Sequence, residues 1–318
     1  MKTIGVLTSG GDAPGMNACI ATIAQSAEAR GVKLRGVFYG FQGLVEGNSI
    51  PIGSELSGLA RRGGTFLGTS RNGNLEDALQ GSSFADILSR CGVDGLIVLG
   101  GGGSLTAAAR LAESGAPIVG IPSTIDNDVL GTEYTLGFDS AVNKAVRIAD
   151  EMMDTAESLS GRIFVLETLG GVTGHIALAT AYAVGADAAL IHELPIDIDA
   201  VARDIKAKMD NGATHGLVVL CEGLGTADIS LGLEDATGRR TRITVLGHAQ
   251  RGGSPTYLDR MLGREFGEAA VELLLAGESG KMVNFYCGRT DSVPLAQVAD
   301  KPKQIDMMQY RAVNDFLP

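Results

Sequence analysis

Short apolar runs alternate with segments of helical length along most of the chain. The runs are continuously apolar rather than interleaved with polar residues, which is typical of parallel strands buried on both faces. The segments between them are amphipathic or rich in alanine, and strands that alternate with helices predict an α/β fold with mainly parallel sheets. Strands are expected at 3–8, 35–39, 95–100, 117–121, 163–167, 188–192, 216–221 and 244–247, and helices at 139–158, 173–184, 197–210 and 257–277.

The amount of predicted structure exceeds one compact nucleotide-binding unit, because these strands and helices spread over 318 residues. We therefore expect two lobes, each a mainly parallel sheet flanked by helices. No linker rich in Pro or Ser separates them, as is expected of a chain that crosses between its lobes more than once.

Charge and hydropathy limit the classes of partner. The formal net charge of −11 argues against general binding to nucleic acid or to an anionic membrane surface, since both attract basic patches. The N-terminal residues enter a strand pattern directly, and no run of about 18 apolar residues suggests a membrane span. These features predict a soluble, cytoplasmic protein.

The cysteines and histidines do not have the spacing of a metal site. Cys19, Cys91, Cys221 and Cys287 form no CxxC pair and lie in or beside apolar segments, so we expect buried free thiols. The four histidines show no HxxxH spacing, which argues against a dedicated histidine metal site.

A glycine-rich stretch, TSGGDAPGMNACI at residues 8–20, directly follows the first strand. Gly10 and Gly11 let backbone N–H groups approach an anion at the start of the next helix, whose N-terminus favours negative charge. An ordinary glycine-rich turn between strand and helix explains the same residues, and this motif alone does not separate the two interpretations.

A second stretch, at residues 120–141, carries Thr124, Asp126 and Asp128 at alternate positions. In an extended segment these side chains point the same way and present two carboxylates and a hydroxyl to one pocket. Such a pair can act as a base toward a hydroxyl group and help to place Mg²⁺. A turn in which Asp and Asn satisfy backbone donors is the alternative, and it would be preferred if this motif stood alone.

The third stretch, at residues 244–260, places His248 and Arg251 after a strand end. Two cationic groups three residues apart can clamp a phosphate monoester. The alternative is a surface turn with a solvated Arg, which the two earlier motifs make less favourable.

A run of four glycines, in LGGGGSLTAAARL at residues 99–111, lies between an apolar run and a helical segment. This is the position of a phosphate-binding turn, yet the run contains no carboxylate that could hold a metal ion.

Together these stretches resemble the bacterial ATP-dependent 6-phosphofructokinase family. The resemblance runs in register through IGVLTSGGDAPGMN, RRGGTFLGTSR, STIDND and GHAQRGGSP and covers nearly the whole chain. It implies two α/β lobes with the active site between them and a homotetramer. The nucleotide-binding lobe would comprise residues 1–138 and 252–300, and the sugar-phosphate lobe residues 139–251 and 301–318.

The resemblance also implies the reaction, which is transfer of a phosphoryl group from ATP, with Mg²⁺, to the C1 hydroxyl of fructose 6-phosphate. Asp126 would be the base, with Thr124 and Asp128 beside it, and Arg71 would stabilise the transferred group. Arg162 and Arg242 would come from a neighbouring subunit. The implied nucleotide-binding residues are Gly11, Phe41, Arg71, Gly101, Gly102, Gly103 and Ser104, and the implied substrate-binding residues are Thr124, Asp126, Asp128, Arg162, Leu169, Gly170, Gly171, Glu222, Arg242, His248 and Arg251.

The chain departs from the family pattern at several of these positions. Gly102 stands where the family has an Asp that holds Mg²⁺, so Asp126 and Asp128 are the remaining candidate ligands. Gly171 replaces an Arg near the reacting sugar, and Phe41 replaces a Tyr on the nucleotide side.

These departures leave alternatives open. The chain can be a kinase for another sugar phosphate, a kinase with another phosphoryl donor, or a catalytically impaired homologue that binds a sugar phosphate in a regulatory role. Gly103 and Ser123 are small, as in relatives that use ATP, whereas relatives that use pyrophosphate have Asp and Lys there. ATP is therefore favoured over pyrophosphate.

Overall fold

The computed structural model describes residues 1–70 and 83–315. The chain divides into two compact units, which are described separately. Unit 1 consists of Met1–Ser140 and Arg251–Lys303, and unit 2 of Ala141–Gln250 and the residues from Gln304 onward.

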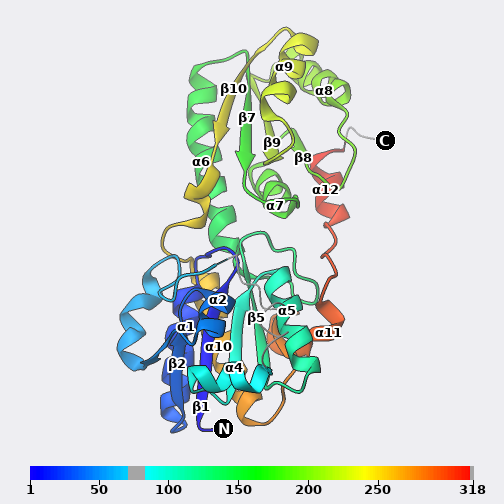
Figure 1. The fold of residues 1–318 in the computed structure, drawn as a ribbon. Coiled ribbons are helices and arrows are strands. Elements are labelled where there is room, and N and C mark those ends of the chain that lie inside the picture. Colours follow the sequence, from blue (N-terminus) through cyan, green and yellow to red (C-terminus); the bar gives the residue numbers. More distant parts are fainter. Residues whose placement is uncertain (71–82, 316–318) are drawn as a thin grey trace. The chain divides into compact units, whose positions relative to one another are not determined.

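Unit 1 is built on a sheet whose central strands are parallel and whose outer strands are not (Figure 1). The strand order is β12-β11-β5-β4-β1-β2-β3, with β6 paired to β5. The edge strands β3 and β12 run antiparallel to β2 and β11. The strands are β1 (Thr3–Ser9), β2 (Lys33–Val37), β3 (Ser49–Ile52), β4 (Gly95–Gly100), β5 (Ile118–Thr124), β6 (Leu136–Gly137), β11 (Lys281–Tyr286) and β12 (Arg289–Pro294).

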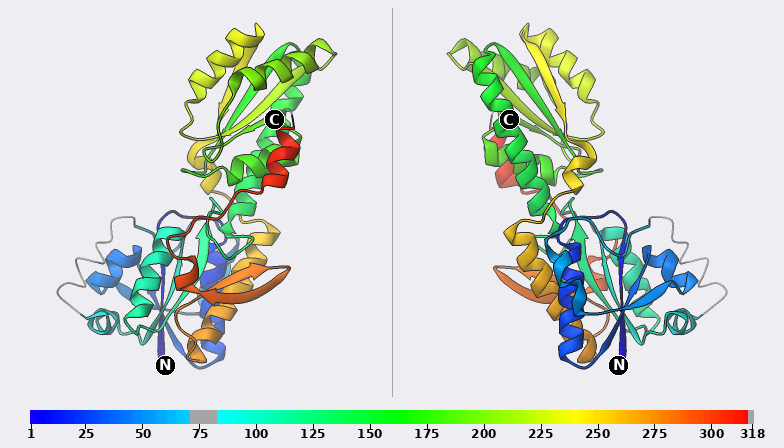
Figure 2. Two further views of the ribbon diagram at one scale, coloured as in Figure 1. Left: turned by 90° about the vertical axis from the view of Figure 1, so that its right-hand side faces the viewer. Right: turned by 90° about the vertical axis from the view of Figure 1, so that its left-hand side faces the viewer.

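Helices cover both faces of this sheet (Figure 2). On one face α4 and α5 pack on Leu7, Leu96 and Val98, while α1 and α10 cover the other. Right-handed crossovers explain this arrangement, because the chain leaves β1 in one direction along the sheet and β4 in the other. The helical elements are α1 (Met16–Ala29), α2 (Gly40–Glu46), η1 (Ser54–Arg61), α4 (Phe84–Cys91), α5 (Gly102–Glu113), α10 (Tyr257–Leu275) and α11 (Leu295–Val298).

The helices α1 and α10 approach each other closely because α10 carries glycine at the contact. A β-carbon at Gly263 would lie 3.1 Å from the backbone nitrogen of Cys19, and one at Gly267 would lie 2.9 Å from the Cys19 carbonyl oxygen. The two helices therefore form one rigid layer under the sheet.

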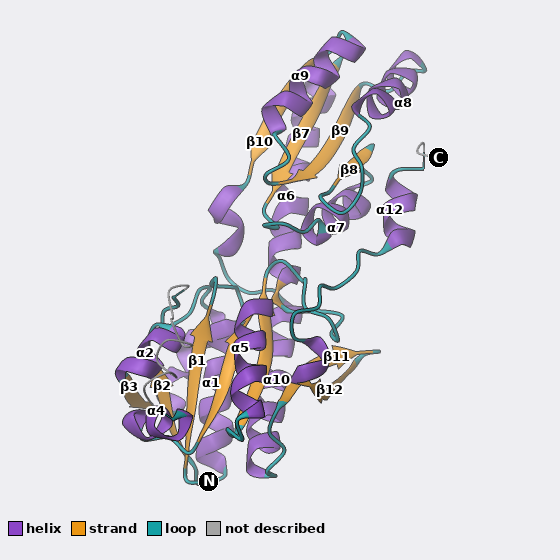
Figure 3. Cartoon of the chain, turned by 45° about the vertical axis from the view of Figure 1, so that its right-hand side comes forward, coloured by secondary structure: helices purple, strands orange, loops and turns teal. Residues whose placement is uncertain are grey.

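Unit 2 has a smaller sheet, of order β10-β7-β9-β8, in which every pair is parallel (Figure 3). One face packs on α6, α7 and α12, and the other on α8 and α9. The elements are α6 (Phe138–Ser158), which begins in unit 1, β7 (Arg162–Thr168), α7 (His175–Val184), β8 (Ala188–Leu190), α8 (Ile198–Asp210), β9 (His215–Cys221), α9 (Thr226–Thr237), β10 (Arg240–Val245), η2 (Gly247–Arg251) and α12 (Met307–Val313).

The predicted α/β class with mainly parallel sheets is confirmed. The strand predicted at 35–39 ends at Val37, because Tyr39 adopts a left-handed φ of 58° and precedes α2. The strand predicted at 244–247 begins earlier, at Arg240. Four strands were not predicted: the short strands β3 and β6, and the antiparallel pair β11 and β12.

The four cysteines are free thiols, but the expectation that all are buried is wrong. Cys287 is exposed because it lies at the turn between β11 and β12, with a left-handed φ of 50°. Within the described residues, none of the helices has both the length and the apolar character needed to cross a membrane.

Candidate active site

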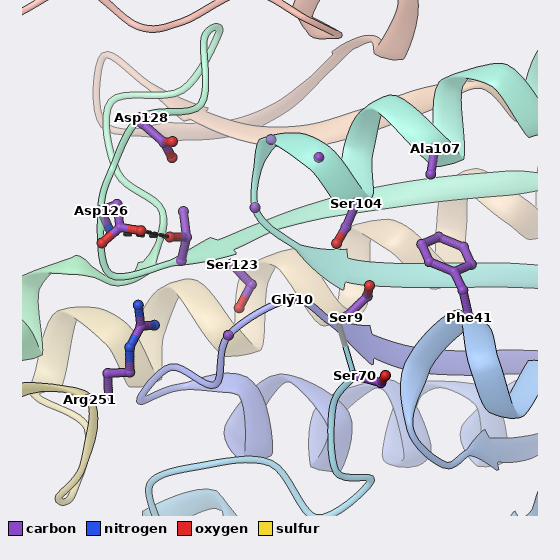
Figure 4. Close-up of a pocket in the computed structure, with 15 residues that line it drawn as sticks. Ser9, Gly10, Phe41, Ser70, Ser104, Ala107, Ser123, Asp126, Asp128 and Arg251 are labelled. Carbon is purple, nitrogen blue, oxygen red and sulfur yellow. Dashed lines mark hydrogen bonds between the residues drawn. The ribbon is translucent and has the colours of Figure 1, made fainter. Parts of the chain in front are cut away.

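A cavity of about 380 Å³ in unit 1 lies at the carboxyl ends of β1, β4 and β5 (Figure 4). Parallel strands bring the loops that follow them to one edge of the sheet, where ligands bind in open α/β folds. The lining residues are Ser9, Gly10, Gly11, Phe41, Ser70, Gly101, Gly102, Gly103, Ser104, Ala107, Ser123, Thr124, Asp126, Asp128 and Arg251.

The carboxylates lie at one end of this cavity. The Thr124 hydroxyl donates a hydrogen bond to Asp126 Oδ2 at 3.2 Å, and Thr124 Oγ1 accepts one from the Asp126 backbone N–H at 3.1 Å. Asp128 lies beside this pair in Figure 4. The site therefore joins two half-buried carboxylates and a hydroxyl, as the spacing predicted.

The segment adopts the alternative conformation that the sequence left open, a turn in which Asn satisfies a backbone donor. The strand β5 ends at Thr124, and Asn127 adopts a left-handed φ of 53°, so the segment is a turn rather than an extended strand. The turn is held by Asn127 Oδ1, which accepts a hydrogen bond from the Thr135 N–H at 3.0 Å, and by the Thr135 hydroxyl, which donates to the Thr124 carbonyl at 2.6 Å.

The glycines of the first motif bring backbone close to the cavity. Gly10 has a φ of 89°, which favours glycine. A β-carbon at Gly11 would lie 2.6 Å from Nη1 of Arg251, so the absence of a side chain leaves room for that guanidinium. Nη1 of Arg251 also donates a hydrogen bond to the Asp12 carbonyl at 3.4 Å. Arg251 thus belongs to unit 1, whereas His248 belongs to unit 2.

The run of four glycines forms the end of β4 and the first turn of α5. The helix begins at Gly102 after the N-cap Gly101, and no side chain caps it. The first N–H groups of any helix lack intrahelical partners, and the residues that carry them here line the cavity, where a helix N-terminus favours an anion. A β-carbon at Gly102 would meet no atom within 4 Å, so the space for a carboxylate is present.

The opposite end of the cavity is apolar. Phe41 and Ala107 lie there, remote from Asp126 and Asp128 in Figure 4. The cavity is therefore graded from an apolar end, past the α5 N-terminus, to a carboxylate end.

The remaining predicted residues belong to unit 2, apart from Arg71, which lies outside the described residues. Glu222 Oε1 accepts hydrogen bonds from the backbone N–H groups of Gly170 at 3.3 Å and Gly171 at 2.7 Å, so these three residues form one cluster with the buried Leu169. Arg162 and Arg242 lie on the neighbouring strands β7 and β10, and His248 lies in η2.

Sequence reasoning missed several residues of the site. Ser9 and Ser70 line the cavity without having been singled out, and the position of Ser9 at the carboxyl end of β1 was the available signal. Asp259 had no local signal, because its partners Gly137 and Ser140 lie more than a hundred residues away in the sequence.

Asp259, on α10, is a fully buried carboxylate beside the site. Its oxygens accept hydrogen bonds from the Gly137 N–H at 2.7 Å, the Ser140 N–H at 2.8 Å and the Ser140 hydroxyl at 2.5 Å. Burial raises the pKa of this carboxyl group to about 6, against the opposing effect of these hydrogen bonds, and Asp139 raises it further.

Comparisons with known proteins identify relatives along most of the chain. The family model described as phosphofructokinase matches residues 3–274. The chain is 41% identical over 309 residues to the ATP-dependent 6-phosphofructokinase of Natranaerobius thermophilus, and 42% identical over 312 residues to ATP-dependent 6-phosphofructokinase 1 of Thermus thermophilus; each alignment covers 96% of both chains. The phosphofructokinase structure from Saccharomyces cerevisiae superposes with a TM-score of 0.85 at 29% identity, covering 94% of this chain and 45% of the yeast chain.

The raised pKa of Asp259 predicts a pH dependence of stability. Because the folded-state pKa of about 6 exceeds the ordinary value of 3.8, the stabilising contribution is complete below pH 3.8 and is lost as the pH rises through 6. The whole change in the free energy of unfolding is about 3 kcal/mol, and about 1.3 kcal/mol of it falls between pH 5 and pH 7. Urea unfolding of the wild type and Asp259→Asn at both pH values should show the wild type losing this amount relative to the variant; a constant difference would contradict it.

Proposed function

The chain belongs to the phosphofructokinase family, and from this premise we propose that it transfers the γ-phosphoryl group of ATP to the C1 hydroxyl of fructose 6-phosphate, giving fructose 1,6-bisphosphate. The observation that carries the proposal is the meeting of Thr124, Asp126 and Asp128 with two glycine-rich turns in one cavity. Identities of about 40% to full-length relatives with this activity in their names support it.

Asp126 is the proposed base. Its carboxylate takes the proton of the C1 hydroxyl while the C1 oxygen forms a bond to the γ-phosphorus, and the bond from that phosphorus to the bridging oxygen breaks to release ADP. The hydrogen bond from the Thr124 hydroxyl to Oδ2 fixes the orientation of the carboxylate. Asp128 contributes a second negative charge beside it.

The change from apolar side chains at one end of the cavity to carboxylates at the other supports one orientation of the nucleotide. The adenine would pack between Phe41 and Ala107, and the phosphates would lie along Gly11 and the N-terminus of α5, formed by Gly101, Gly102, Gly103 and Ser104. Backbone N–H groups and the helix dipole favour an anion at this place. Arg71 would stabilise charge on the transferred phosphoryl group.

Mg²⁺ fits the residues that are present. Within the described chain there is no group of three or more His, Cys, Asp or Glu side chains that would form an all-protein metal site. A nucleotide-bound Mg²⁺ needs only one or two carboxylates beside the phosphates, and Asp126 and Asp128 line the cavity where those phosphates would lie. Bound Mg²⁺ would offset charge on the phosphate oxygens.

Unit 2 is the proposed sugar-phosphate lobe, and unit 1 the proposed nucleotide lobe. The cluster of Leu169, Gly170, Gly171 and Glu222 would contact the sugar, and His248 with Arg251 would bind its phosphate. Charge-assisted hydrogen bonds from such cations contribute about 1.5–3 kcal/mol each.

We further propose a homotetramer in which Arg162 and Arg242 complete the site of a neighbouring subunit. The strand β10 is an edge strand of its sheet, and Ile243 and Val245 on it are 45% and 56% exposed. Exposed apolar side chains on an edge strand favour association with a second copy. The proposed location of the protein is the cytoplasm, where ATP and sugar phosphates are metabolised.

A kinase for another sugar phosphate is the second candidate. A side chain at Gly171 would meet no atom within 4 Å, so this chain has open space at a position that would contact the sugar. Initial rates with a panel of sugar phosphates and with ATP, GTP or pyrophosphate distinguish the candidates. Fructose 6-phosphate and ATP should give the highest kcat/KM, and a clearly better acceptor or donor would replace them in the proposal.

Asp126→Asn should lower kcat by about 10²–10⁴-fold, because an amide cannot take the C1 proton. The KM for fructose 6-phosphate should change little, since the amide keeps the shape of the carboxyl group. The matched control is Asp235→Asn, the same substitution at an exposed position on α9, which should keep wild-type kinetics. A loss of less than tenfold in the Asp126 variant would exclude this residue as the base.

Gly102→Asp should lower the Mg²⁺ concentration that half-saturates nucleotide binding by roughly tenfold, the effect of about 1.4 kcal/mol from one added ligand. The position has no neighbouring atom within 4 Å and no left-handed φ, so the substitution should be tolerated. Calorimetric titration of ATP at varied Mg²⁺ measures the effect independently of turnover. Gly58→Asp, at another position without neighbours, is the control for added charge. Equal Mg²⁺ dependence in all three proteins would contradict the metal assignment.

Mixed oligomers test the shared site. Asp126→Asn and Arg242→Ala should each be inactive or nearly so as pure oligomers. Subunits of the two variants, dissociated together and reassociated, should recover a fraction of wild-type activity, because some sites then receive an intact Asp126 from one subunit and an intact Arg242 from another. No recovery, with mixed oligomers demonstrated by native mass spectrometry, would place both residues in the site of one subunit.

A further inference from the structure

We propose that Asp259 is a positioning residue for phosphoryl transfer, whose carboxylate fixes the start of α6 and with it the path of residues 124–137. This inference rests on the proposed function, since that segment carries the proposed base. Asp259 does not line the cavity and acts through other residues.

The first step is the set of hydrogen bonds that Asp259 accepts from the start of α6. The helix begins at Phe138, so Gly137 and Ser140 supply N–H groups at its N-terminus, and such groups have no partner within the helix. Asp259 accepts hydrogen bonds from both, and the Ser140 hydroxyl adds a third. An ionised carboxylate at a helix N-terminus is also stabilised by the helix dipole.

The second step connects Gly137 to the proposed base. The two-residue strand β6 pairs with the end of β5, and its register places Gly137 opposite Thr124 and Leu136 opposite Ser123. Gly137 is thus held by Asp259 and by its pairing with the strand end from which Asp126 follows. The loop between Thr124 and Gly137 therefore begins and ends at this pair of strands, β5 and β6.

The third step is the contact with the nucleotide side. A β-carbon at Gly15 would lie 3.4 Å from Cβ of Asp259 and 3.1 Å from its carbonyl oxygen. Gly15 is the N-cap of α1 at the end of the first glycine-rich loop, with a φ of 99°. Asp259 therefore holds the start of α6 and lies close to the start of α1, and these are the helices that follow the two proposed reaction loops.

The chemistry of the position argues for this role. Three donors converge on Asp259, and an ionised carboxylate accepts from all of them without presenting a donor of its own. An asparagine keeps the shape but turns an N–H₂ group toward one of these donors. Burial opposes ionisation of this carboxyl group, as the raised pKa of Asp259 indicates, whereas its three hydrogen bonds favour the ionised form.

The test is Asp259→Asn, with Asp139→Asn as the matched control. Asp139 lies on the same helix start, and its carboxylate accepts a hydrogen bond from the Thr256 hydroxyl. Asp259→Asn should lower kcat at least tenfold with KM for ATP within threefold of wild type. Hydrogen–deuterium exchange should accelerate in peptides that cover 124–138 and stay unchanged in β1 and β4. Asp139→Asn should leave kcat and the exchange of 124–138 unchanged.

Wild-type kcat or unchanged exchange at 124–138 in folded Asp259→Asn would overturn the proposal. If that variant does not fold, Ser140→Ala removes one of the three donors and should accelerate exchange at 124–138 while lowering kcat about threefold to tenfold. Wild-type values for Ser140→Ala would then overturn it. The exchange measurement needs no substrate, so absence of fructose 6-phosphate kinase activity in the wild type would refute the proposed function and leave the positioning tested separately.

Discussion

The parallel alignment of β1, β4 and β5 is the constraint on which the site depends. The register places Ser9 opposite Gly100 and Gly100 opposite Pro122, so the three strands end at nearly the same level. The loops that follow them must then meet at one edge of the sheet. Residues that are far apart in the sequence become neighbours through this register alone, and the chemistry of the cavity follows from which residues come just after each strand.

The glycines at this edge serve different physical purposes. A β-carbon at Gly100 would lie 2.5 Å from Cβ of Ser104 and 2.8 Å from the Ser9 carbonyl oxygen, so glycine is needed for the close approach of strand and helix. Gly11 leaves space for the Arg251 guanidinium. Gly102 has neither a close neighbour nor a left-handed backbone. Its lack of a carboxylate is therefore not required by the fold.

The sequence predicted those features that depend on local patterns. Apolar runs located the central strands, and the motifs around Gly10, Thr124 and the glycine run located the loops of the cavity. A turn in this stretch was the alternative to an extended segment, and the motif could not decide between them because the hydrogen bond of Asn127 with Thr135 forms only in the folded chain. The strand β6 is two residues long, which is too short for any periodic signal.

The role of Asp259 was also beyond local patterns, for a different reason. The residue lies at the first turn of α10, where an acidic side chain is ordinary on local grounds. Its significance comes from Gly137 and Ser140, which the fold brings to it from another helix start. Sequence motifs identify residues that face a ligand more readily than residues that hold those residues in place.

The two glycine departures from the family pattern have different structural consequences. Gly102 and Gly171 both have open space where a side chain would project. Gly171, however, has a φ of 61°, and its N–H donates to Glu222, so a larger residue there would adopt a left-handed conformation at about 1–2 kcal/mol or release that hydrogen bond. Gly102 carries no such penalty. A single substitution can therefore place a carboxylate at the start of α5, whereas at Gly171 the loop conformation itself is matched to glycine, and a different side chain there would require the loop to change as well.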